Sequence, residues 1–201
     1  MADVMRLGRV PYAQAWTLQT RLVEQRAAGL IRDTVVVCTH DPVYTVGRKR
    51  GSAANLLDVG DVPVFEVERG GDVTFHGPGQ IVAYPILLLE GAKRDLHAHL
   101  RRLETLMIDV CGRFGLEAGR DARNTGAWAN GRKLGSIGIS CRRWVTFHGL
   151  ALNVNTDLAW FRRVNPCGFD ATIMTSMAAE LGHELDETAV EAALIAEVVT
   201  W

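Results

Sequence analysis

Residues 127–154 read AWANGRKLGSIGISCRRWVTFHGLALNV, and this stretch decides the fold class. The pair Asn130-Gly131 lies between two strand-like runs, residues 127–129 and 133–140, and is the strongest short hairpin signal that a sequence offers. A third strand-like run, residues 144–154, follows directly. Consecutive strands joined by short turns predict an antiparallel sheet in this part of the chain.

The segments on either side extend this sheet and add helices. Apolar residues at helical spacing predict helices over residues 12–30 and 96–114, and the capping box Thr188-x-x-Glu191 predicts a last helix. Further β-like runs lie at 34–39, 43–46, 64–68, 73–76 and 81–89, and shorter helical pieces lie at 157–163 and 175–181. Because hairpins follow one another instead of alternating with helices, we expect an α+β fold with a mixed, mostly antiparallel sheet flanked by helices.

The composition describes a soluble globular chain with one domain over residues 1–201. Its 22 basic and 23 acidic side chains give a formal net charge of −1, so no overall field attracts nucleic acid or an anionic membrane. The longest apolar run, residues 81–89, is far shorter than the ~20 residues that cross a bilayer, and residues 1–14 lack the apolar block of a secretory signal. We therefore expect a cytoplasmic protein, and a monomer.

The four cysteines lie far apart, with no C-x-x-C pair and no histidine at metal-ligand spacing, so we expect thiols and no metal site. Cys38 in an apolar run and Cys111 in a helix fit small buried hydrophobic residues, whereas Cys141 beside two arginines is ambiguous. Cys167 differs, because it stands in the sequence NPCGF, where proline and glycine favour a turn that displays the thiol for chemistry.

Three short stretches come close to known functional motifs but do not satisfy them. Residues 126–133, GAWANGRK, come close to a phosphate loop, but Arg132 stands where a lysine should follow the second glycine. Residues 134–138, LGSIG, lack the first glycine of a serine-hydrolase elbow. His97 and His99 lie two apart in a helix and cannot face the same side, so we expect a solvated pair and not a metal site.

Three segments gather glycines and unusual polar residues, and we interpret them as one site. Residues 68–80, ERGGDVTFHGPGQ, let the backbone approach a ligand and offer amide donors. Residues 131–138, GRKLGSIG, form a strand whose glycines predict close approach by something linear and apolar. Residues 147–154, FHGLALNV, then lead on towards Cys167. Plain hairpins and a bulged strand are the alternative, although turns alone do not explain Arg69, Thr74 and His76.

With these motifs the chain resembles the lipoyl(octanoyl) transferases of lipoate biosynthesis, the lipoate-protein ligase B family. The resemblance rests on RGGDVTFHGPGQ, GRKLGSIGIS, HGLALNV and NPCG, in that order, along most of residues 34–170. It implies a single catalytic domain like that of biotin and lipoate ligases. It also implies transfer of an octanoyl group from octanoyl-acyl carrier protein to a lysine of a lipoyl domain.

The resemblance assigns roles position by position. Cys167 matches the nucleophile that forms an acyl thioester, and Lys133 matches the residue that activates the thiol and the incoming amine. The implied acyl-substrate contacts are Arg69, Gly70, Gly71, Asp72, Val73, Thr74, Phe75, His76, Ser136, Ile137, Gly138, Gly149, Leu150 and Ala151. Two positions depart from the family pattern, since we expect Tyr at Phe75 and Ala at Ser136, so that one hydroxyl is lost and another is gained.

A thiol suits this reaction, because exchange between two thioesters is nearly thermoneutral and divides acyl transfer into two easier steps. Lys133 can act either as a cation that favours the thiolate or as a proton acceptor, and the sequence leaves both roles open. Backbone amides of the glycine loops such as Gly77, or the side chains of His76 and His148, are candidates for stabilising the oxyanion. No cofactor is expected, because the acyl group arrives on the phosphopantetheine of acyl carrier protein.

The expected partners are octanoyl-acyl carrier protein and then the lipoyl domains of 2-oxoacid dehydrogenase and glycine cleavage proteins, with no nucleic acid and no membrane. Carrier proteins of this kind are acidic, so we expect a basic rim around the groove drawn from Arg48, Lys49, Arg50, Arg142 and Arg143. Two alternatives stay open: an ATP-dependent lipoate or biotin protein ligase of the same fold, and a non-catalytic module that binds an acyl or lipoyl group.

Overall fold

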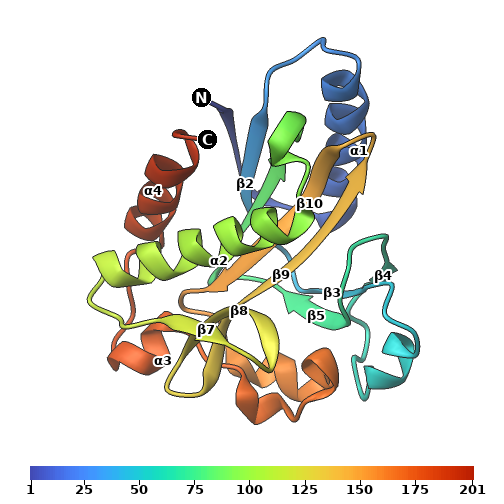
Figure 1. Ribbon diagram of the computed structural model, residues 1–201. Coiled ribbons are helices and arrows are strands. Elements are labelled where there is room, and N and C mark those ends of the chain that lie inside the picture. The colour runs from blue at the N-terminus through green and yellow to red at the C-terminus, as the bar shows by residue number, and fades with distance from the viewer.

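The computed structural model describes residues 1–201, except that the side chain of Cys167 lies outside the described residues. Within these bounds, seven strands form a sheet in the order β1-β2-β6-β10-β9-β8-β7 (Figure 1). The strands are β1 (Asp3–Val10), β2 (Thr34–His40), β6 (Gln80–Ile86), β10 (Val145–Asn153), β9 (Arg132–Arg142), β8 (Asn124–Ala129) and β7 (Gly119–Asp121). Only β1 and β2 pair in parallel here, so the expected mixed, mostly antiparallel sheet is confirmed.

Helices pack on both faces of this sheet (Figure 1). α2 (Leu96–Arg113) and α4 (Glu187–Val198) cover one face, where Val37, Ile81 and Leu152 meet Met107 and Leu194. α1 (Tyr12–Ala27) covers part of the other face, to which the alternating strand residues Val36, Val82, Tyr84 and Ala151 point. The remainder of that second face, over β9 and β10, is left for the site.

A second sheet lies beside this uncovered part. In the described chain it has three strands, in the order β4-β3-β5. Its strands are β4 (Val64–Glu66), β3 (Val43–Val46) and β5 (Val73–His76). The amide of Gly70, between β4 and β5, donates to the carbonyl of Ile139 at 2.8 Å, so this loop crosses β9. Short helices complete the chain: η1 (Ser52–Asn55), η2 (Gly91–Lys93), η3 (Leu158–Arg163), η4 (Pro166–Gly168), η5 (Ala171–Ile173) and α3 (Met177–Leu181).

The Asn130-Gly131 hairpin is confirmed, with φ values of 50° and 72° that this turn requires. Two local expectations are wrong. The last helix is capped by Asp186, whose side chain accepts from the Thr188 amide, and not by Thr188. His99 is buried, at 4% exposure, instead of forming a solvated pair with His97, because it faces the core against Trp201.

Candidate active site

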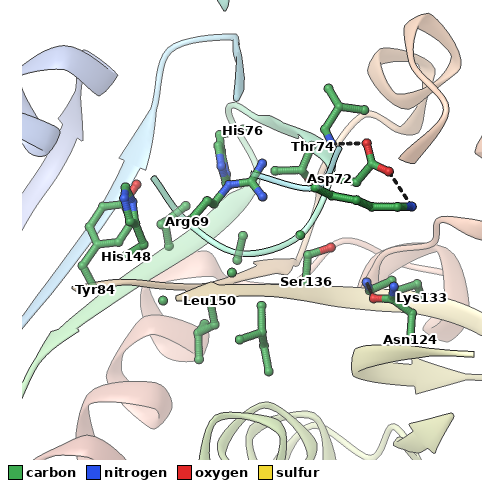
Figure 2. A pocket seen from close by; sticks show the side chains of 18 of the residues that line it. Arg69, Asp72, Thr74, His76, Tyr84, Asn124, Lys133, Ser136, His148 and Leu150 are labelled. Atoms are coloured by element: carbon green, nitrogen blue, oxygen red, sulfur yellow. Dashed lines mark hydrogen bonds and ion pairs between the residues drawn. The ribbon is translucent and has the colours of Figure 1, made fainter. Parts of the chain in front are cut away.

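A pocket lies between β9 and β10 of the large sheet and the loop that joins β4 to β5 (Figure 2). Its cavity of about 90 Å³ is far larger than the ~10–15 Å³ that one water molecule needs. The lining residues are Tyr12, Lys49, Arg69, Gly71, Asp72, Val73, Thr74, His76, Val82, Tyr84, Asn124, Lys133, Ser136, Ile137, Gly138, His148, Gly149, Leu150 and Ala151. The structure thus brings Lys133 together with most of the residues expected to contact an acyl substrate.

Three of the expected residues, Gly70, Phe75 and Gly77, do not belong to this lining. Side chains alternate along β5, so Thr74 and His76 reach the pocket while Phe75 points away. Phe75 is fully buried and stacks on Trp160, with ring centroids 5.3 Å apart, and a Cβ on Gly77 would overlap its ring. Phe75 lacks the hydroxyl of the tyrosine expected there, but this leaves the pocket lining unchanged because its ring lies outside the pocket. Ser136, the other position that departs from the family pattern, does line the pocket.

The glycines of β9 make room for the protein's own side chains. A Cβ on Gly138 would lie 2.8 Å from Cδ of Arg69, and a Cβ on Gly135 would lie 2.5 Å from the sulfur of Met107 on α2. Gly135 therefore makes room for α2, whereas Gly138 lines the pocket, and the close approach of an apolar ligand there stays a prediction. Gly138 shapes the pocket indirectly, by allowing the Arg69 side chain to lie across the strand.

Lys133 lies on β9 beside the hairpin turn, and its side chain is buried at 2% exposure. Its Nζ donates to the side-chain oxygen of Asn124 at 2.6 Å and lies 5.8 Å from the Trp128 ring centroid. The register of β8 and β9 shifts between Ala127 and Trp128, so pairing in this hairpin is irregular next to the lysine. Sequence reasoning missed Asn124, because this contact depends on that irregularity and not on spacing.

The side chain of Cys167, the expected nucleophile, lies outside the described residues, but the backbone of its turn is described. The amide of Asn165, just before that turn, donates to the carbonyl of Asn55 at 2.8 Å. The Asn55 side chain in turn donates to Asp72, which lines the pocket, at 2.8 Å. The turn that carries Cys167 is therefore tied to the edge of the pocket.

Asp72 and Lys49 form an ion pair at this edge, with Nζ 2.9 Å from Oδ2 (Figure 2). Burial opposes ionisation of Asp72, but hydrogen bonds from Lys49, Asn55 and the Val73 amide outweigh it and hold the pKa of the carboxyl below its usual range. A Cβ on Gly168 would lie 3.6 Å from Nζ of Lys49, so this ammonium stands beside the residue that follows Cys167.

His76 is held neutral and cannot donate to an oxyanion. Burial is the largest cause that lowers its pKa to about 3, followed by the charges of His40 and Arg69. The Gln80 amide nitrogen donates to Asn153 and to the Phe75 carbonyl, so the Gln80 oxygen accepts from Nδ1 of His76 at 2.8 Å. The proton of neutral His76 is thereby fixed on Nδ1, and Nε2 is left as an acceptor.

His148 lies at the opposite end of the pocket from Lys133 (Figure 2). Burial lowers its pKa to about 4, although the nearby Glu68 carboxylate opposes the shift. Its Nε2 has no hydrogen-bond partner among the described residues, and its backbone is strained at φ 55°, with the amide donating to Gln19. These positions correct the expectation that His76, His148 or Gly77 stabilises an oxyanion near Lys133, and they leave the backbone amides of the glycine-rich loop.

Two tyrosines that sequence reasoning treated as helix and strand positions also line the pocket. Tyr84 on β6 is buried and donates its hydroxyl to Nε2 of His40 at 2.7 Å, because Nδ1 of His40 is occupied by the Val10 carbonyl. Tyr12 stacks on His76, with ring centroids 6.0 Å apart. Tyr12 lies on α1 itself and Tyr84 packs on the α1 face of the sheet, and Tyr84 lies at the end of the pocket away from Lys133 (Figure 2).

The five residues of the expected basic rim lie in two separate places in the structure. Arg142 and Arg143 both pair with Glu24 of α1, whereas Lys49 lines the pocket. Arg48 and Arg50 flank Lys49, are exposed, and form no ion pair within the described chain. The basic segment at the pocket is therefore Arg48-Lys49-Arg50.

Among the described side chains, no group of three or more His, Cys, Asp or Glu could hold a metal ion. In the part of the chain that the structure describes, every helix is too short or too polar to span a bilayer.

Comparisons with known proteins agree with this geometry. Residues 11–199 match the lipoyl protein ligase A/B catalytic domain. An octanoyltransferase of Rubrobacter xylanophilus is 47% identical, covering 96% of this chain and 90% of its own length. An octanoyltransferase of Geobacter metallireducens is 50% identical, covering 88% of this chain and 82% of its own length.

Solved structures show the same fold. Lipoate-protein ligase A bound with ATP has a TM-score of 0.74 at 14% identity, covering 96% of this chain and 82% of its own. A bipartite lipoate protein ligase of Thermoplasma acidophilum, described with its E2 lipoyl domain, has a TM-score of 0.70 at 14% identity, covering 97% of this chain and 81% of its own. The expected ligase-like domain is thus confirmed, and the chain belongs to the lipoyl protein ligase A/B catalytic domain family, with octanoyltransferases as its sequence relatives.

Proposed function

We propose that this protein is an octanoyltransferase that carries an octanoyl group from acyl carrier protein to a lysine of a lipoyl domain through a thioester on Cys167. The observation that carries the proposal is the amine of Lys133, a residue buried at 2% exposure at one end of the pocket. The turn of Cys167 is tied to the same pocket through Asn55 and Asp72. A cysteine and a buried amine at one pocket suit covalent acyl transfer.

The pocket suits an unbranched acyl chain. Val82 and Ala151 contribute apolar side chains to it, whereas Ile137 and Leu150 line it along the strands while their side chains pack into the core on the α2 side. Each methylene that leaves water contributes about 0.8 kcal/mol, so a chain of eight carbons gains several kcal/mol from such a lining. The polar groups at the Tyr84 end do not favour a much longer apolar chain.

The chemistry proceeds in two balanced steps. The Cys167 sulfur attacks the carbonyl of the donor thioester, its proton passes to the departing phosphopantetheine thiol, and an octanoyl thioester remains on the protein. The amine of the lipoyl-domain lysine then attacks this thioester, forms the amide, and loses a proton as the Cys167 thiol departs. Lys133 serves both steps, as a cation beside the sulfur or as the group that relays the proton.

Backbone amides are the donors that remain for the oxyanion in both steps. His76 presents an acceptor, and His148 lies at the other end of the pocket. Gly71 and Asp72 lie on the loop over β9 and line the pocket, so their amides are close to the place where the carbonyl would react.

The proposed partners are two protein-borne substrates. The Arg48-Lys49-Arg50 segment at the pocket suits an acidic carrier protein. A lipoate ligase of the same fold has been described with an E2 lipoyl domain, which supports a lipoyl domain as acceptor.

The test is transfer from octanoyl-acyl carrier protein to a lipoyl domain without ATP, followed by the mass of the lipoyl domain. We expect octanoylation of one lysine, and a lipoyl domain with that lysine replaced by arginine is the control. Octanoylation that needs ATP and free octanoate would instead indicate a ligase. Binding of the carrier with no octanoylated product would indicate a non-catalytic module.

A further inference from the structure

A buried carboxylate outside the pocket is bound to the strand that holds Lys133. Glu104 lies on α2, and its side chain is only 2% exposed. Its Oε2 accepts from Arg101 at 2.8 Å and from Arg120 at 2.9 Å, and its Oε1 accepts from the backbone amide of Gly126 at 3.2 Å. One oxygen therefore serves the two cations that compensate its buried charge, and the other is left for β8.

Gly126 is the point at which β8 passes Lys133. A Cβ at this position would lie 2.8 Å from Cε of Lys133, and the φ of 148° also favours glycine. Two residues earlier, Asn124 accepts the hydrogen bond from Nζ of Lys133. The same short strand therefore contacts the lysine at its last carbon and at its nitrogen.

Strand pairing is irregular on both sides of this part of β8. On one side β8 pairs with β7, which has three residues and an irregular register. On the other side the register with β9 shifts immediately after Gly126 and Ala127. The hydrogen bond that the Gly126 amide donates to Glu104 fixes the strand to α2, between these two irregular regions.

We propose that Glu104 is a positioning residue for Lys133: it holds Gly126, and with it Asn124, where the two residues keep the lysine amine in the pocket. This inference rests on the proposed function, because it takes the amine of Lys133 to be the group that serves the reaction. Glu104 is not among the described residues that line the pocket, and its hydrogen bond to Gly126 links it to β8. A displacement of about 1 Å at a reacting group can cost 10²-fold in rate.

The test compares Glu104→Ala with Glu104→Gln, whose amide oxygen can still accept from Gly126. For each we measure kcat and KM for octanoyl transfer, the pH profile of Cys167 alkylation, and the melting temperature. We expect Glu104→Ala to lower kcat by about 10- to 100-fold at nearly unchanged KM and to shift the alkylation profile. Glu104→Gln should recover most of the rate and the wild-type profile.

Arg101→Ala is the matched control, because it removes an ion pair of Glu104 but leaves the Gly126 contact. It should lower the melting temperature while kcat and the alkylation profile stay as in wild type. If Glu104→Ala does not fold, Glu104→Asp carries the same prediction, since it keeps the charge for the arginines but is one methylene too short for Gly126. A folded Glu104→Ala or Glu104→Asp with wild-type kcat and alkylation profile would overturn the proposal, and so would equal loss of kcat in Arg101→Ala.

The alkylation profile separates this proposal from the proposed function, because it needs no acyl substrate. If the wild type transfers no octanoyl group but Glu104→Ala still shifts the profile, the proposed function fails and the positioning of Lys133 stands. If the wild type transfers octanoyl and neither kcat nor the profile changes in Glu104→Ala, the positioning role fails alone.

Discussion

The Nζ of Lys133 and the side-chain oxygen of Asn124 lie 2.6 Å apart, which joins β9 to β8 at one end of the pocket (Figure 2). Lys133 is buried, so this hydrogen bond fixes where its amine points. The turn of Cys167 reaches the same pocket through Asn55 and Asp72. Acyl transfer is therefore expected to depend on Lys133, and this dependence can be measured.

Replacing Lys133 by Met should lower kcat for octanoyl transfer by about 10²- to 10⁴-fold, because the amine proposed to stabilise the thiolate or relay the proton is lost. The far-ultraviolet circular dichroism should stay native. Lys93→Met makes the same chemical change at an exposed site on η2 and should keep full activity. A Lys133→Met enzyme within threefold of wild type would remove the proposed role.

Replacing Gly138 by Ala should destabilise the protein by about 1–3 kcal/mol and impair transfer, because a Cβ there would lie 2.8 Å from Cδ of Arg69 and 2.9 Å from the Gly70 carbonyl. Gly112→Ala is the control, since nothing lies within 4 Å of a Cβ at this helical position. It should stabilise the protein by about 0.5–1 kcal/mol. Urea unfolding measures both changes, and equal free energies of unfolding for the two variants would contradict the prediction.

Stability should fall between pH 7 and pH 5 in part through His99. Burial, aided by the charge of Arg102, lowers the pKa of His99 to about 4 in the folded state. Below about pH 6.5 the unfolded chain therefore binds a proton that the folded chain does not, and each pH unit removes about 1.4 kcal/mol of stability. Replacing His99 by Gln should thus reduce the loss between pH 7 and pH 5 by about 2 kcal/mol.

Urea unfolding of the wild type and of His99→Gln at pH 7 and pH 5 measures this difference. The interpretation is wrong if His99→Gln loses as much stability on acidification as the wild type does.

Replacing Arg48 and Arg50 together by Ala should raise KM for octanoyl-acyl carrier protein several-fold and weaken its dependence on salt, because both residues flank Lys49 at the pocket. Arg143→Ala should leave KM unchanged, since Arg143 pairs with Glu24 of α1. Measuring KM over a range of NaCl concentrations distinguishes the two variants. Identical salt dependence in all three proteins would exclude this segment as the carrier contact.

Local sequence patterns predicted much of this fold, because several of its turns and helices form for reasons contained in the adjacent residues. The Asn130-Gly131 turn and the helix over residues 96–114 follow from backbone preference and apolar spacing alone. β1 was missed because it is a half-exposed edge strand without clear alternation. The orientation of Phe75 could have been predicted, since alternation along residues 73–76 puts Thr74 and His76 on one face and Phe75 on the other.

The rest of the site depends on contacts between distant segments, which no spacing reveals. Tyr84 lies in an apolar run typical of the core, and only the packing of α1 and the second sheet turns it towards a pocket. Asn124 reaches Lys133 because the register of β8 and β9 is irregular. Glu104 lies within a helix, and its bond to Gly126 appears only once α2 has packed on the sheet.

The most direct test of the central claim is the mass of the intact protein after incubation with octanoyl-acyl carrier protein. The account predicts a gain of one octanoyl group that hydroxylamine removes, in the wild type and in Cys141→Ser, whose cysteine is the partly exposed one among the described thiols. The same treatment of Cys167→Ser should give no hydroxylamine-labile adduct. Absence of the adduct in the wild type, or its persistence in Cys167→Ser, would contradict the account.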